Sequence, residues 1–109
     1  MTLPLNTARV AHKFGGSSVA DADCIRRVVA LIREGEKAGH QLVVVVSAMR
    51  GVTDALIQLA EAAFAQAPEV EARWAALRDR HFTAIESLKP ASLDALKKSL
   101  NESFTRLSV

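Results

Sequence analysis

The sequence predicts an α/β fold, in which one βαβ unit is followed by a helical hairpin, and three observations support this prediction. A short strand-like run, Arg9–Phe14, is followed directly by two adjacent glycines. A helical pattern of apolar residues follows it, and then a continuous apolar run, Leu42–Val46, that is typical of a strand in a parallel sheet. A strand, a crossover helix and a parallel strand form one βαβ unit.

The first strand is expected at residues 9–14, after residues 1–8, which we expect to form a loose leader around Pro4. His12 lies within this strand. We expect it to be packed or partly exposed rather than to bind a metal ion, because no second ligand stands at a suitable spacing.

The first helix is expected to begin at Asp21, which can cap it, while Asp23 adds negative charge to its first turn. Gly35 and Gly39 should loosen and end this helix. The apolar residues that should face the sheet are Ile25, Val28, Val29 and Ile32. Gln41–Val46 is the second strand, and its apolar residues predict burial on both faces.

Thr53 or Asp54 should open the next helix, whose expected apolar side consists of Leu56, Ile57, Ala60 and Phe64. Residues 69–109 predict an antiparallel helical hairpin. The apolar stripe of its first helix would contain Val70, Trp74, Leu77, His81, Ile85 and Leu88. The stripe of its second helix, capped by Ser92, would contain Leu93, Leu96, Leu100, Phe104 and Leu107. His81 is expected to be a core or interface histidine.

Composition excludes several classes of protein. The net charge of +2 over 109 residues is too small to indicate nucleic-acid binding, and the chain has few aromatic residues on which bases could stack. The single cysteine, Cys24, rules out an internal disulfide and fits a reducing compartment. Neither a signal peptide nor a membrane-spanning run is visible. We therefore expect a cytoplasmic protein without nucleic-acid or membrane partners.

The turn after the first strand, Lys13–Val19, has the composition of a phosphate-binding loop. Adjacent glycines let backbone N–H groups approach an anion closely, Lys13 adds positive charge, and Ser17 and Ser18 add hydroxyl groups. The lysine precedes the glycines, so this is not the P-loop sequence, in which it follows them.

A second loop, Ser47–Asp54, directly follows the second strand and is also rich in small and hydroxyl residues. Open α/β sheets bind ligands at the carboxyl ends of their strands. Because both loops follow parallel strands, the sequence predicts that they form one site at that edge.

The two loops resemble those of a known family. Lys13–Val19, which reads KFGGSSV, and residues 43–57, which read VVVVSAMRGVTDALI, are similar to the opening of an aspartate kinase, a member of the amino-acid kinase superfamily. The alanine-rich helix after residues 51–54 most resembles the kinase half of bifunctional aspartokinase–homoserine dehydrogenases. The resemblance implies that residues 9–109 are the N-terminal part of an amino-acid kinase (carbamate-kinase-like) fold. Residues 9–54 would be the βαβ unit with both substrate loops, and residues 55–109 a helical region.

The family's reaction is transfer of the ATP γ-phosphoryl group to L-aspartate with Mg²⁺, which gives 4-phospho-L-aspartate in the first step of lysine, threonine and methionine biosynthesis. By resemblance, Lys13 is the catalytic residue and binds the ATP phosphates. The other residues implied in phosphate binding are Gly15, Gly16, Ser17 and Ser18. Ser47 and Thr53 would hold the aspartate, and Gly51 would let the loop fold tightly. No protein metal ligand is expected, and a homo-oligomer, commonly a dimer, is implied.

Parts of the family's site have no counterpart in these 109 residues: an acidic residue, an Arg-Gly-Gly-Ser-Asp-type segment and the nucleotide-base pocket. We therefore expect the N-terminal portion of a longer protein, inactive and self-associating by itself. Two alternatives stay open. One is an amino-acid kinase for glutamate or acetylglutamate, which the Ser47–Asp54 loop disfavours, and the other is a non-catalytic oligomerisation module.

Overall fold

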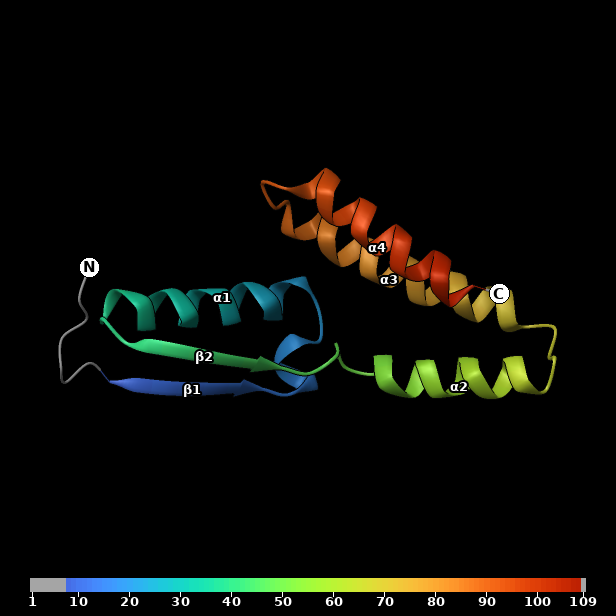
Figure 1. Ribbon diagram of the computed structural model, residues 1–109, viewed down its shortest axis with the longest axis horizontal. Coiled ribbons are helices and arrows are strands. Elements are labelled where there is room, and N and C mark those ends of the chain that lie inside the picture. Colours follow the sequence, from blue (N-terminus) through green and yellow to red (C-terminus); the bar gives the residue numbers. More distant parts are fainter. Residues whose placement is uncertain (1–7, 109) are drawn as a thin grey trace. The chain divides into compact units, whose positions relative to one another are not determined.

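The computed structural model describes residues 8–108, which form two compact units that join between Arg50 and Gly51 (Figure 1). The elements of the first unit are β1 (Arg9–Phe14), the 3₁₀ helix η1 (Gly16–Val19), α1 (Ala22–Lys37) and β2 (Gln41–Val46). Those of the second are α2 (Val52–Phe64), α3 (Val70–Leu88) and α4 (Leu93–Leu107). The predicted order of strands and helices is confirmed. The expected leader lies outside the described residues except for Ala8.

The strands β1 and β2 pair in parallel, from Arg9 opposite Gln41 to Phe14 opposite Val46. The helix α1 lies along one face of this pair (Figure 1). The core of the first unit consists of the buried Phe14, Val19 and Val28 with the partly buried Ile25 and Ile32. His12 stacks on Phe14, with ring centroids 5.8 Å apart, as expected for a packed strand histidine.

The expected burial of β2 on both faces is wrong for the described chain. Val43 is 63% exposed and Val45 is 51% exposed. Side chains alternate between the faces of a strand, so Val43 and Val45 lie on the face opposite Leu42, which contacts α1. Among the described residues the sheet has two strands, and they leave this second face of β2 open.

The start of α1 is capped as predicted, whereas the predicted effect of Gly35 on this helix is wrong. The Asp21 carboxylate accepts a hydrogen bond of 2.9 Å from the Cys24 backbone N–H, and this bond lowers the pKa of Asp21. Gly35 does not loosen the helix, since it lies within α1, where an added Cβ would be 3.1 Å from the Leu42 side chain. Gly39, with φ +79°, follows the helix end in the left-handed conformation that favours glycine. Val29, expected to face the sheet, is 38% exposed.

In the second unit α3 and α4 form the predicted antiparallel hairpin around Phe104. The Trp74 indole N–H donates a 3.0 Å hydrogen bond to the Phe104 carbonyl, and the His81 ring lies 5.2 Å from the Phe104 ring. At the other end of the hairpin, Lys97 and Glu86 form a 3.0 Å ion pair. His81 is thus half-buried against Phe104 between the two helices, in agreement with the packed position predicted from the stripe.

The expected apolar side of α2 is wrong. The buried residues of this helix are Val52, Leu59 and Ala62, whereas Ile57 is 53% exposed and Phe64 is 94% exposed. Apolar residues surround most of this helix, so periodicity alone could not choose the face that packs. The helix also begins at Val52, one residue before the earlier of the two predicted starts.

The contrast between the two phenylalanines gives the first prediction. Phe104→Ala should destabilise the hairpin by about 3–5 kcal/mol, because it removes a buried ring from its core. Phe64→Ala should change the free energy of unfolding by less than about 0.5 kcal/mol, because that side chain is exposed. Urea unfolding followed by the fluorescence of Trp74 measures both changes. Equal losses in the two variants would contradict the assigned core.

Candidate functional site

The register of the two strands brings the predicted loops together. Phe14 and Val46 are the last paired residues of β1 and β2. The pairing continues one step further, since the Ser47 backbone N–H donates a 3.0 Å hydrogen bond to the Phe14 carbonyl. Gly15 and Ser47 therefore leave the sheet side by side, at the carboxyl ends of their strands.

Gly16 lies directly against the loop that follows β2. A Cβ built on Gly16 would be 3.5 Å from the Arg50 Cα and 3.6 Å from both the Ala48 carbonyl oxygen and the Ser47 Oγ. A methyl group would therefore fit between Gly16 and this loop at ordinary van der Waals distances, so the two loops lie close together. The Ser47 hydroxyl donates a 2.8 Å hydrogen bond to the Ala48 carbonyl. Gly16 and Ser47, two of the predicted site residues, are thus neighbours in space.

Neither backbone strain nor crowding within the chain explains why residue 15 is glycine. Gly15 has φ −75° and ψ 177°, an extended conformation open to any residue. A Cβ added there would meet no atom within 4 Å. The lack of a side chain leaves the backbone beside the loop accessible, as close approach by a ligand requires.

The remaining predicted phosphate-binding residues surround this backbone. Lys13 is exposed and pairs with Val45, on the strand face opposite the buried Phe14. Ser17 and Ser18 are exposed on η1. The Ser18 backbone N–H donates to the Gly15 carbonyl at 3.0 Å, so this N–H serves the turn rather than a ligand.

The predicted residues Gly51 and Thr53 belong to the start of α2 in the second unit. Gly51 caps the helix in the left-handed conformation, with φ +83°, and no side chain accepts a hydrogen bond at this cap. Glycine is required here by conformation, in agreement with the tight fold expected of this loop. Thr53 is exposed in the first turn of the helix.

One residue near this turn was missed by the sequence analysis. The guanidinium Nη1 of Arg80, from α3, lies 3.6 Å from the position of a Cβ added to Gly51. Arg80 is half-buried. Sequence spacing gave no signal for this contact, because it depends on how α3 packs against α2.

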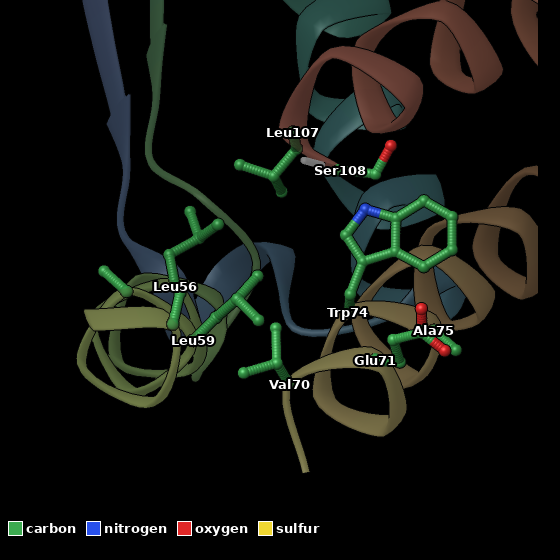
Figure 2. Close-up of a pocket in the computed structure, with 10 residues that line it drawn as sticks. Leu56, Leu59, Val70, Glu71, Trp74, Ala75, Leu107 and Ser108 are labelled. Carbon is green, nitrogen blue, oxygen red and sulfur yellow. The ribbon is translucent and has the colours of Figure 1, made fainter. Parts of the chain in front are cut away.

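The second unit also contains an apolar cavity of about 580 Å³ between α2, α3 and the end of α4 (Figure 2). Leu56, Leu59, Val70, Trp74 and Leu107 line it. The Trp74 indole N–H already donates a hydrogen bond to the Phe104 carbonyl, so this N–H does not serve a ligand in the cavity. None of the predicted site residues lines this cavity.

Within residues 8–108, no group of three or more histidine, cysteine, aspartate or glutamate side chains could hold a metal ion. No helix in this part of the chain is long and apolar enough to cross a membrane.

Comparison with known proteins identifies the class to which this fold and loop pair belong. Residues 8–105 match the Amino acid kinase family, and the chain belongs to that family. The chain is 60% identical over 53 residues to an aspartokinase of Mycolicibacterium smegmatis, a match that covers 49% of this chain and 13% of the relative.

Further aspartokinases show similar matches. One from Rickettsia conorii is 46% identical over 52 residues, or 48% of this chain, and one from Thermus thermophilus is 48% identical over 54 residues, or 50% of this chain. Each match covers 13% of the relative. The similarity thus concerns a small part of these relatives.

The geometry of the glycines gives the second prediction. Gly15→Ala should leave the free energy of unfolding within about 1 kcal/mol of its original value, because the backbone conformation suits alanine. It should weaken ATP binding at least about tenfold, since the new methyl group stands where phosphate oxygens would approach the backbone. Calorimetric titration with ATP measures the affinity.

Gly39→Ala is the matched control, because a Cβ there also meets no atom within 4 Å but φ is +79°. This variant should lose about 1–2 kcal/mol of stability and keep its ATP affinity. Unchanged ATP affinity in Gly15→Ala would remove Gly15 from the site.

Proposed function

We propose that the protein to which these residues belong is an aspartate kinase, which transfers the γ-phosphoryl group of ATP to the side-chain carboxylate of L-aspartate. The product is 4-phospho-L-aspartate, in the first step of lysine, threonine and methionine biosynthesis. The observation that supports this proposal most is the proximity of Gly16 to the Ser47–Arg50 loop at the carboxyl ends of two parallel strands. The names of the aspartokinase relatives support the choice of substrate.

In the proposed reaction an oxygen of the aspartate side chain attacks the γ-phosphorus. The new O–P bond forms as the bond from the γ-phosphorus to the bridging oxygen breaks, and ADP leaves with that electron pair. The attacking carboxylate is already ionised at neutral pH, so no general base is needed. Catalysis then depends on positioning the two substrates and on neutralising phosphate charge.

Lys13 is the proposed catalytic residue, because its ammonium group can follow the charge that moves onto the ADP oxygens. The backbone N–H groups of Gly15 and Gly16 would bind phosphate oxygens, with the hydroxyls of Ser17 and Ser18 beside them. These groups lie at the end of β1 and in η1, so a short stretch of chain would supply the phosphate contacts.

The aspartate itself is assigned to the second loop. Ser47 and Thr53 both carry hydroxyls that can bind a carboxylate or an ammonium group. Gly51 caps α2 in the left-handed conformation, two residues before Thr53. Three residues of one loop would thus select the amino-acid substrate.

Magnesium is implied by the family's reaction. Mg²⁺ is usually held by one or two carboxylates together with substrate phosphates. In the part of the chain that the structure describes, no group of three or more histidine, cysteine, aspartate or glutamate side chains could hold a metal ion. No step of the proposal depends on a magnesium ion held by the protein alone.

The alternatives differ in substrate or in activity. The relatives are named aspartokinases, which favours aspartate over glutamate or acetylglutamate. A homoserine dehydrogenase half stays a prediction from the alanine-rich α2 alone. A purely non-catalytic module is disfavoured by Gly15, whose open backbone has no structural explanation within the chain.

We also propose a cytoplasmic homo-oligomer. The single cysteine fits a reducing compartment. The exposed valines of β2 form an apolar face of the kind that association between chains would cover.

The third prediction tests the proposed reaction. Formation of aspartyl phosphate from ATP and aspartate, trapped as the hydroxamate, should be observed for the full-length protein. Lys13→Ala should lower kcat about 100-fold or more, because charge stabilisation in the transition state is lost. Lys37→Ala, at the exposed end of α1, is the control and should keep kcat. Near-normal turnover by Lys13→Ala would contradict its catalytic role, and absence of hydroxamate with the unaltered protein would overturn the proposed function.

A further inference from the structure

We propose that Arg80 is a positioning residue for the aspartate-binding loop and helps to set the affinity for aspartate. This inference rests on the proposed function, since it assigns a role to a residue beside Gly51 and Thr53. It concerns a residue of α3, distant in sequence from both predicted loops. Nothing in the pattern of the chain pointed to it.

The contact between Arg80 and the turn is close. The guanidinium Nη1 is 3.6 Å from the position that a Cβ on Gly51 would occupy, so any side chain at position 51 would touch it. Gly51 adopts φ +83°, and the cap that it forms has no side-chain hydrogen bond of its own. A half-buried guanidinium beside this turn would limit its movement, and through it the placement of Thr53.

The charge of Arg80 also suits the proposed substrate. The first N–H groups of a helix lack partners within the helix, and they make its N-terminus electropositive. A cation beside such a terminus is unfavourable unless negative charge is near. The Asp54 carboxylate adds negative charge to the first turn of the helix. Aspartate carries two carboxylates and one ammonium group, so its binding would add net negative charge at this turn.

The chain offers a matched control on the same helix. Arg73 lies about two turns earlier in α3 and also reaches α2, where its guanidinium donates a 3.0 Å hydrogen bond to the Gln58 side chain. Gln58 is in the body of α2, beyond the first turn. Replacing Arg73 therefore removes an arginine contact between the same two helices without removing the one beside Gly51.

The fourth prediction compares Arg80→Gln with Arg73→Gln in the full-length protein. Arg80→Gln should raise KM for aspartate about tenfold and change KM for ATP less than twofold, because the phosphate-binding residues are untouched. Arg80→Lys, which keeps the charge but not the planar group, should recover part of the aspartate affinity. Arg73→Gln should leave both KM values within about twofold of the original.

The outcomes separate this inference from the function on which it rests. If the unaltered protein does not phosphorylate aspartate, both are overturned. If it does, and Arg80→Gln keeps its KM for aspartate or raises both KM values equally, only the role of Arg80 is overturned. Thermal unfolding of each variant identifies a general loss of structure, and an Arg80→Gln protein whose KM change follows such a loss would also contradict a positioning role.

Discussion

The parallel pairing of β1 with β2 is the constraint on which the candidate site depends. Its register places Phe14 opposite Val46, and one more hydrogen bond places Ser47 beside the start of the glycine turn. A shift of one residue in this register would move Ser47 away from Gly16. It would also reverse which residues of β2 share a face of the sheet with Lys13. The register is held by α1, which packs Val28 and its neighbours against Phe14. Packing on one face of the sheet thus sets the geometry of its edge.

The glycines of this chain meet different physical requirements. Gly39 and Gly51 adopt positive φ, so conformation requires them. Gly35 allows α1 to approach Leu42. Gly15 has neither reason, and the proposed phosphate site would account for a glycine there. Conformation and packing thus explain Gly35, Gly39 and Gly51 but not Gly15.

The sequence predicted those features that local chemistry determines. The bounds of both strands, the Asp21 cap and the hairpin of α3 and α4 follow from residue type and periodicity, and the structure confirms them. The buried side of α2 could not be predicted, because apolar residues lie on several sides of this helix. One of them, Phe64, is almost fully exposed. Arg80 could not be predicted either, since its contact with Gly51 depends on helix packing. The burial of β2 was overestimated, because the apolar sequence of a strand does not show which other elements pack against its faces.

The central claim is that the ends of β1 and β2 together form a phosphate-binding edge. Hydrogen–deuterium exchange of the full-length protein, with and without ATP, tests it most directly, because bound phosphate protects backbone N–H groups that it accepts hydrogen bonds from. The account predicts slower exchange in peptides that contain Gly15 and Gly16, and in those that contain Ser47, with α4 unchanged. Protection confined to α2, α3 and α4, or no protection at saturating ATP, would contradict it.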